Sequence, residues 1–397
     1  MPQLEVKQNV EAEQLKQAFC SVIAEIAQRL PNTPILGQVK AFEIYIPHLS
    51  VSAISLGHWF HKEKLIWPFL GLIRFYRWQG LYNRALTWSH QCLECVQSGC
   101  GERHPDVATS LDNIAAIYRV QKHYEKAKPL YYQALEIRQY LFGEEHPEVA
   151  TSLNNLANLY SDEENYEEAK PLFLRALEVY EHFFGKNHLH TVTTLNNLAD
   201  LYRDQKYYEE AETIYLEVLE RKRCLFGNKH PSLAVTLNNL ATLYREQKRY
   251  EDAEQLYQQA LHLDRYLLGE EHQDTHNSLL SLARLYRDWN KDEEAEPLYL
   301  EVIALEEHLM QQGNTDALCV SLYELYDIYF AKELFQQTEF ILEKISRLER
   351  YLFGDQHVLV GRRFNELAWL YQIQGHIERA NNFYQKASQI FQHSFGE

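Results

Sequence analysis

The chain has 397 residues, of which 46% are hydrophobic and 24% charged, and this composition is that of an ordinary globular protein. Only 15 glycines and 11 prolines occur, and so few turn formers argue against an all-β fold. The formal net charge of −17 disfavours binding to nucleic acid or to an anionic membrane surface, and the sequence contains neither a membrane-spanning apolar run nor a signal peptide, so we expect a cytoplasmic protein.

The N-terminal segment, residues 1–61, is expected to form a helical cap. Residues 8–30 fit one amphipathic helix ended by Pro31 and Pro34, and residues 37–60 fit a second helical segment interrupted near Pro47. The apolar face of the first helix comprises Leu15, Ala18, Phe19, Val22, Ile23, Ile26 and Leu30. Because the end of a repeat array exposes an apolar face, we expect this segment to cover the first repeat.

The rest of the chain, residues 62–397, is built from an internal repeat of 42 residues. The period is visible in the glycines Gly101, Gly143, Gly185, Gly227 and Gly269, each followed three residues later by a histidine: His104, His146, His188, His230 and His272. A Leu-Asn-Asn-Leu-Ala block then recurs at 153–157, 195–199 and 237–241. Periods of this length are typical of solenoids.

Each repeat is predicted to be two antiparallel helices of roughly 16 and 19 residues. In residues 231–269 the apolar residues recur with the helical period on both sides of a short polar turn, Glu246 to Arg249, and Gly269 is expected to close the second helix in a left-handed conformation. We therefore predict an all-α solenoid of eight helix pairs. Their approximate ranges are 66–100, 108–142, 150–184, 192–226, 231–268, 276–311, 319–353 and 361–395.

The recurring tyrosines and alanines of the repeat have the spacing seen in Tyr160, Tyr166 and Ala169. This spacing resembles the tetratricopeptide repeat. The 42-residue period and the Phe-Gly-x-x-His-Pro loops at 142–147 and 226–231 resemble the kinesin-light-chain type. That resemblance covers about residues 66–397 and implies a right-handed superhelix whose concave groove binds peptides or protein segments. The segments Tyr45–Leu49 and Leu65–Phe69 resemble the entry into repeat arrays of bacterial, often cyanobacterial, NB-ARC- or NACHT-linked proteins.

Asparagines recur on the predicted first helix of the repeat, at Asn113, Asn155, Asn197 and Asn239. Packing does not require a polar residue there, and the family resemblance implies that these positions line the groove. An asparagine amide offers a donor and an acceptor, so it can pair with an extended peptide backbone of any sequence. The alternative is a hydrogen-bond ladder between neighbouring repeats.

Six residues after each asparagine lies a row of arginines, Arg119, Arg203, Arg245 and Arg287, with Ser161 interrupting the row. Such a row favours an acidic ligand segment, and these arginines are further candidates for peptide binding. The alternative is that they pair with acidic residues of neighbouring repeats, since Asp162, Asp204, Glu246 and Asp288 lie close by in sequence.

No motif for catalysis or nucleotide binding occurs, so we predict no catalytic residue, no metal site and no cofactor. The recurring histidines could bind metal or sense pH, but their place just before Pro105, Pro147 and Pro231 favours a role in the turn. The Cys92-x-x-Cys95 pair, with Cys100 beyond, resembles a zinc spacing, yet Cys92 occupies a small core position of the repeat.

The repeats diverge after residue 276, where Leu280, Tyr323, Phe330 and Trp369 replace polar groove-side residues. This end could be an apolar surface for a partner or for homo-oligomerisation, or it could be terminal capping. We predict a non-catalytic scaffold or adaptor that binds a peptide or protein segment. The alternative is a ligand-sensing regulatory array of a signalling ATPase of the NB-ARC or NACHT type.

Overall fold

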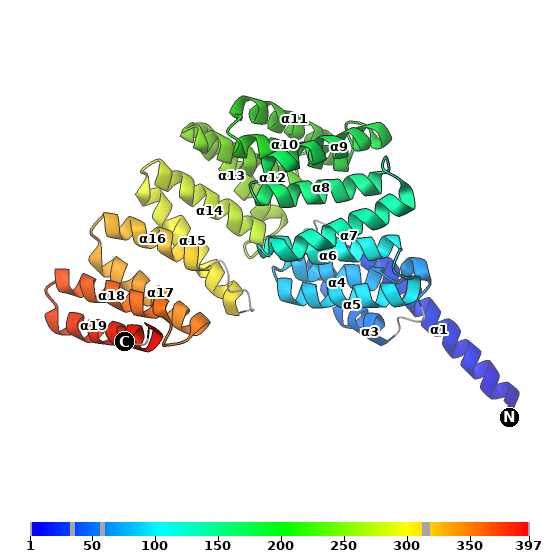
Figure 1. The fold of residues 1–397 in the computed structure, drawn as a ribbon, viewed down its shortest axis with the longest axis horizontal. Coiled ribbons are helices and arrows are strands. Elements are labelled where there is room, and N and C mark those ends of the chain that lie inside the picture. The colour runs from blue at the N-terminus through cyan, green and yellow to red at the C-terminus, as the bar shows by residue number, and fades with distance from the viewer. Residues whose placement is uncertain (1, 32–35, 56–59, 312–317, 396–397) are drawn as a thin grey trace. The chain divides into compact units, whose positions relative to one another are not determined.

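The structure is a computed structural model that describes residues 2–31, 36–55, 60–311 and 318–395. All regular secondary structure in these ranges is helical, which confirms the all-α prediction (Figure 1). Three helices precede the repeats: α1 (Pro2–Gln28), α2 (Leu36–Glu43) and α3 (Ile46–Ser55). A short 3-10 helix, Lys62–Lys64, follows them.

Sixteen further helices form eight consecutive pairs, each with a first and a second helix. The pairs are α4 (Trp67–Trp78) with α5 (Tyr82–Cys100), α6 (Pro105–Val120) with α7 (Tyr124–Phe142), α8 (Pro147–Asp162) with α9 (Tyr166–Phe184), α10 (Leu189–Asp204) with α11 (Tyr208–Phe226), α12 (Pro231–Glu246) with α13 (Tyr250–Leu267), α14 (Gln273–Asp288) with α15 (Asp292–Gln311), α16 (Leu318–Ala331) with α17 (Phe335–Phe353), and α18 (Val358–Ile373) with α19 (Ile377–Phe395). The helices of a typical pair have 16 and 19 residues, as the sequence pattern predicted.

The recurring histidines determine where the first helices begin. In His146, as in its equivalents, Nδ1 accepts a hydrogen bond from the backbone N–H two residues later, at 3.2 Å. The ring also stacks on Phe142 at the end of the preceding helix, with 4.6 Å between centroids. Because this cap satisfies an N–H of the first turn, α6, α8 and α10 begin three residues earlier than the predicted starts at 108, 150 and 192.

The glycines that end the second helices have positive φ, as expected, but their ψ is extended and not left-handed helical. Gly143, for example, has φ 79° and ψ 170°. Side-chain-bearing residues avoid this region, so the backbone itself requires glycine here, although the space around a Cβ would be open.

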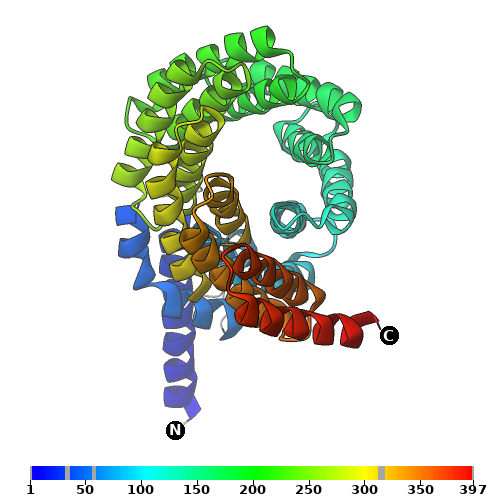
Figure 2. The same ribbon diagram turned by 90° about the vertical axis from the view of Figure 1, so that its left-hand side faces the viewer.

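The described chain divides into two compact units, with the boundary between Thr275 and His276, inside α14. In unit 1, the unit up to Thr275, the second helices α5, α7, α9 and α11 each pack between the first helix of their own pair and that of the next pair. The first helices α6, α8, α10 and α12 also contact one another in sequence. Neighbours are closest on the inner side of a curved stack, so these helices line the inner face, and the two curved layers are visible in cyan and green in Figure 2.

The N-terminal helices α1 and α3 pack against α4, and only part of the predicted face of α1, Ile23 and Ile26, takes part in the core. Helix α1 begins at Pro2 and buries Cys20, Ile23, Ala24 and Ala27, whereas Leu15, Phe19 and Val22 are exposed. The small side chains of Ala24 and Ala27 let α1 lie close to α4, since Gly71 of α4 faces Ala27 across the contact. The division into a cap, residues 1–61, and a repeat array, residues 62–397, stays a prediction.

Unit 2, from His276 onward, contains its own core around Leu342, Leu367 and Tyr371. The apolar residues predicted at its surface differ in exposure. Phe330 and Trp369 are exposed and lie against each other, with 5.5 Å between ring centroids, whereas Leu280 and Tyr323 are half-buried. Self-association through this end stays a prediction.

Candidate peptide-binding face

The asparagine row lies on the inner face of unit 1, on α6, α8, α10 and α12, where all four side chains are half-buried. Two of them hydrogen-bond the preceding first helix. Asn197 Nδ2 donates to Asn154 Oδ1 at 3.3 Å, and Asn239 Nδ2 donates to Asp200 Oδ1 at 2.7 Å. Asn155 lies beside the carboxylate of Asp112. Asn113 donates to Thr109 O of its own helix, at 3.0 Å. A ladder between neighbouring repeats is therefore present.

The ladder uses only part of the hydrogen-bonding capacity of these amides. An asparagine has two donor hydrogens and a carbonyl oxygen with two acceptor sites. Within the described residues, the Oδ1 atoms and the second amide hydrogens of Asn197 and Asn239 make no hydrogen bond. Because both residues are half-buried and not fully buried, these groups remain accessible to solvent or to a ligand. The ladder and a ligand contact are thus compatible.

The arginine row lies at the C-terminal ends of the first helices and is half-buried. Arg119 pairs with Asp162 of the next repeat at 2.9 Å, and Arg203 pairs with Asp204 at 2.7 Å. Arg287, in unit 2, lies 3.4 Å from Asp288 and from Glu324 of the next first helix. Arg245 lies near Glu246 and Tyr257. Pairing with acidic residues of the array is therefore observed for Arg119, Arg203 and Arg287.

Two kinds of residue on this face were not predicted from the sequence. Arg77 lies 42 residues before Arg119, is exposed, and extends the arginine row by one repeat. The ladder acceptors Asn154 and Asp200 were also not predicted. The 42-residue period alone could have revealed Arg77. The ladder acceptors, in contrast, can be identified only from the contacts between neighbouring first helices.

Asp200, a ladder acceptor on the inner face, has a perturbed pKa. Burial raises its pKa to about 6, and the nearby guanidinium of Arg203, at 3.6 Å, opposes this increase. Tyr215 of α11 donates a hydrogen bond to the same carboxylate that accepts from Asn239. The carboxylate therefore connects three helices, α10, α11 and α12.

A second row that the sequence analysis did not predict lies inside the array, at one register of the second helices. Its members are 42 or 43 residues apart, and each is at most 4% exposed: Arg138, Tyr180, Lys222, Asp264, Glu306 and Glu349. In the sequence, this row could have been found as ionisable or hydroxyl side chains that recur within the apolar face of the second helices. These residues contact first helices, for example Arg138 with Asp112 and Ser152, and so they join neighbouring repeats.

No other chemistry is evident in the described parts of the chain. The structure brings together no group of three His, Cys, Asp or Glu side chains that could hold a metal ion within these residues. Cys92 is fully buried, and its Sγ lies 3.3 Å from Ser110 Oγ, which agrees with a small core position. Among the described helices, none combines the length and the apolar content needed to cross a membrane.

Comparison with solved structures finds the following three chains among its matches. A signal transduction ATPase (STAND) protein with a tetratricopeptide repeat sensor, from Pyrococcus horikoshii, is 16% identical, with a TM-score of 0.57, covering 90% of this chain and 54% of that one. A Rap protein complexed with Competence and Sporulation Factor is 17% identical, with a TM-score of 0.52, covering 96% and 97%. A putative kinesin light chain from Podospora anserina is 24% identical, with a TM-score of 0.41, covering 51% and 96%.

Comparison with curated protein sequences finds no match. The tetratricopeptide repeat profile, however, matches five overlapping segments: 66–139, 113–182, 148–223, 190–265 and 232–307. Together these segments extend without a gap from residue 66 to residue 307, and they coincide with the helix pairs from α4 to α15. The chain therefore belongs to the tetratricopeptide repeat family.

Proposed function

We propose that the protein is a non-catalytic scaffold that holds an extended peptide, or a segment of a partner protein, along the inner face of unit 1. The observation that carries this proposal is the row of half-buried amides at Asn155, Asn197 and Asn239, which keep donors and acceptors unused by the ladder. Neighbouring first helices in a stacked array are about 10 Å apart, close to the length of three extended residues. An extended chain could thus present one peptide group to each amide.

The arginine row supports an acidic partner. The guanidinium of Arg119 has five donor hydrogens, and its ion pair with Asp162 is mainly made through Nη1. Arg77 is exposed and occupies the equivalent position one repeat before Arg119. An acidic side chain of the partner could pair with this row of cations, although the overall charge of −17 opposes a strongly acidic partner elsewhere on the surface.

The test separates a ligand contact from the ladder. Asn197→Ala removes the candidate ligand amide together with its bond to Asn154, whereas Asn154→Ala removes the same ladder bond and leaves the Asn197 amide in place. A phage-displayed library of random peptides is selected on the wild-type chain, and the affinity of the selected peptides for all three proteins is measured by calorimetry. Circular dichroism checks that helicity is equal.

We expect Asn197→Ala to weaken the selected peptides about tenfold, as for the loss of a buried hydrogen bond, and Asn154→Ala to change affinity less than about twofold. Equal weakening by both variants would assign the asparagines to the ladder alone. If the wild type selects no peptide, the scaffold proposal fails.

A second candidate is that ligand occupancy of this array regulates an ATPase of the NB-ARC or NACHT type. Its basis is that the segments Tyr45–Leu49 and Leu65–Phe69 resemble the entry into the repeat arrays of such proteins. In the structure, Leu49, Ile66 and Phe69 of these segments pack into one core cluster with α1. Ligand binding should then alter hydrogen exchange in residues 45–69. Unchanged exchange in this region, with the selected peptide bound, would remove this candidate and leave the scaffold proposal intact.

A further inference from the structure

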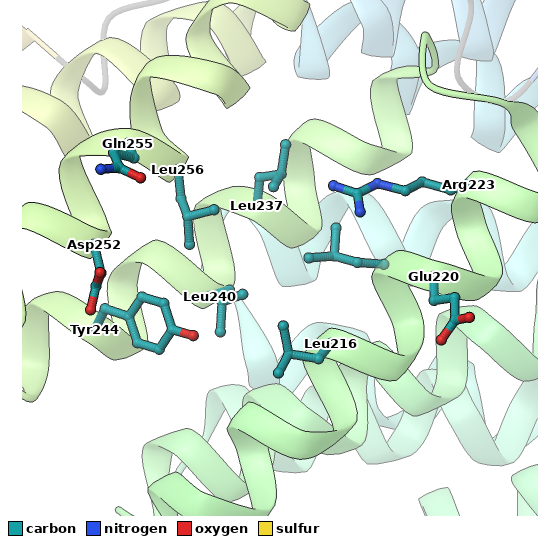
Figure 3. A pocket seen from close by; sticks show the side chains of 10 residues that line it. Leu216, Glu220, Arg223, Leu237, Leu240, Tyr244, Asp252, Gln255 and Leu256 are labelled. Atoms are coloured by element: carbon teal, nitrogen blue, oxygen red, sulfur yellow. The ribbon is translucent and has the colours of Figure 1, made fainter.

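A groove lies between the second helices α11 and α13, with α12 as its floor, on the side of unit 1 opposite the inner face (Figure 3). It consists of two adjoining pockets of about 550 and 290 Å³, which share Leu219, Arg223 and Leu237. We call it the outer groove. Its apolar lining consists of Leu216, Leu219, Leu233, Leu237, Leu240, Leu256 and Leu263.

The lining residues on α11 and α13 recur at helical spacing, so each helix turns one side toward the groove. On α11, Leu216, Leu219 and Arg223 are separated by three and four residues, so they lie on one side of that helix. On α13 the lining extends from Asp252 to Leu263, which is about 16 Å or three helical turns. Leu216 is 50% exposed at the edge. A third helix can pack into a groove of this length between two helices.

Arg223 differs from its equivalents in other repeats. At this register the side chain normally hydrogen-bonds an acidic residue five positions later: Gln97 with Glu102 at 2.8 Å, Gln139 with Glu144 at 3.0 Å, Arg265 with Glu270 at 2.9 Å, and Arg350 with Asp355 at 2.6 Å. The fifth residue after Arg223 is Asn228, which carries no charge. Among the described residues, no ion pair or hydrogen bond is made by the Arg223 side chain.

The free guanidinium is directed toward the leucines. In Figure 3 it reaches toward Leu237, whereas the carboxylate of Glu220 points away from the leucine side chains. The outer groove thus combines an apolar lining with one basic group that lacks a partner. A ligand that covers the leucines and brings a carboxylate to Arg223 would satisfy both features.

Neighbouring repeats do not offer this combination. Between α7 and α9 the residue equivalent to Leu216 is Tyr132, whose hydroxyl bonds Tyr160 at 2.7 Å across the junction. Between α9 and α11 the residue equivalent to Arg223 is Glu181, which has the opposite charge. The combination of leucines with an unpaired arginine is therefore absent from the junctions between α7 and α9 and between α9 and α11.

We propose that the outer groove binds an amphipathic helix of a partner protein, with the apolar face of that helix on the leucines and one of its acidic residues paired with Arg223. Four lining leucines, Leu219, Leu233, Leu237 and Leu240, are already at most 5% exposed. The apolar contact is therefore made by exposed Leu216 and half-buried Leu256 and Leu263, and the charge-assisted pair fixes the register of the helix. This surface is separate from the asparagine row, so the protein would hold two partner segments on opposite sides of unit 1.

The test uses a displayed library of amphipathic peptides of about 18 residues, long enough to form a helix. Leucines are fixed at helical spacing, and the flanking positions are randomised among Glu, Lys and Ser. Selections are run in parallel on the full chain and on Arg223→Glu. We expect Glu to be enriched at one flanking position on the wild type and Lys at the same position on Arg223→Glu. Selection on Arg265→Glu, the register-matched control, should give the wild-type result.

Leu216→Asp should lower the affinity of the selected helix more than about tenfold, because an apolar contact is replaced by a charge. Leu174→Asp is the control, since Leu174 has the same register on α9 and a similar exposure of 44%. Equal effects of the two variants, or the absence of charge inversion with Arg223→Glu, would overturn the proposal.

Two further measurements separate the remaining outcomes. Asn197→Ala should leave helix binding unchanged, so that the failure of the inner-face proposal and the failure of this one can be told apart. If no helix is selected, and the wild type self-associates with rising concentration while Leu216→Asp stays monomeric, the outer groove binds a second copy of the chain and the partner-helix proposal is wrong.

Discussion

The two units differ in the charges that they bury at one register of their second helices. Unit 1 buries the cations Arg138 and Lys222 as well as the anion Asp264, whereas the residues of unit 2 at this register, Glu306 and Glu349, are both anions. Arg138 lies between the carboxylates of Asp112 and Glu148, whereas Glu306 accepts hydrogen bonds from neighbouring first helices. The repeat therefore tolerates a buried charge of either sign, provided that the flanking first helices supply a matching partner.

The side chains that pair with the buried charges differ from one junction between repeats to the next. His276 Nε2 and Ser321 Oγ lie 2.8 and 2.9 Å from Glu306 Oε1, and neither could replace the carboxylates around Arg138. Consecutive repeats that share their apolar pattern are thus not interchangeable. A wrong pairing of helices would leave a buried charge without a partner, which is far more costly than a mismatch of apolar side chains.

The largest effect is expected for Arg138→Met. The substitution keeps most of the apolar volume but leaves Asp112 buried without its cation, and burial already raises the pKa of this carboxyl group. We expect a loss of about 3–5 kcal/mol in local stability, measured by hydrogen exchange of the α7 and α8 amides. Arg175→Met, which removes an exposed ion pair with Glu145, is the control and should cost less than about 1 kcal/mol.

The double variant Arg138→Met with Asp112→Leu sharpens this prediction. Because both charges are removed, most of the lost stability should return. If Arg138→Met alone changes exchange by no more than Arg175→Met does, the buried cation does not stabilise this junction.

A smaller effect is expected for Glu306→Gln in unit 2. The amide oxygen can still accept from His276 and Ser321, but both hydrogen bonds lose the assistance of the negative charge. We expect a loss of about 1–2 kcal/mol in the exchange of α15 and α16. Glu307→Gln, next to it but in an exposed pair with Lys344, should have almost no effect, and a larger loss for Glu307→Gln would contradict the assignment.

The smallest effect at neutral pH is expected for Lys222→Met. Lys222 donates to Thr236 Oγ1 and Ser232 O, which are uncharged, so the buried ammonium has much weaker compensation than Arg138 has. Burial lowers its pKa to about 8, below the value in the unfolded chain. A depressed pKa contributes stability that is present above the unfolded value and is lost as the pH falls through about 8.

Urea unfolding at several pH values between about 7 and 10.5 tests this prediction. The difference in the free energy of unfolding, wild type minus Lys222→Met, should decrease as the pH falls, and at pH 7 the variant should be at least as stable as the wild type. A difference that does not depend on pH would show that Lys222 is as well compensated as Arg138.

Much of the fold could be predicted from the sequence because the evidence for it is local. Apolar residues at helical spacing, the closing glycines and the histidines before Pro105 and Pro147 all lie within one repeat, and their 42-residue period shows them several times. The asparagine row could be assigned to the first helices for the same reason. Its hydrogen bonds to Asn154 and Asp200 could not, because residues about 40 positions apart meet only when the repeats stack.

Whether a side chain is exposed was harder to predict from the sequence than the helix to which it belongs. Leu15, Phe19 and Val22 share an apolar face with Ile23, yet only Ile23 is buried, because the contact with α4 covers just one side of α1. Arg223 and Arg265 look alike in sequence, and the difference between them lies in the loop residue each can reach, Asn228 or Glu270.

By itself the sequence determined that this protein is an array of helix pairs, how long each helix is, and which positions recur along it, since backbone hydrogen bonds and apolar periodicity act over a few residues. Only the tertiary structure decided which charged residues are buried, what each of them pairs with, and where the array leaves a leucine-lined groove beside an arginine without a partner. These properties depend on the distance between side chains of different repeats, and that distance is set by how the helices pack.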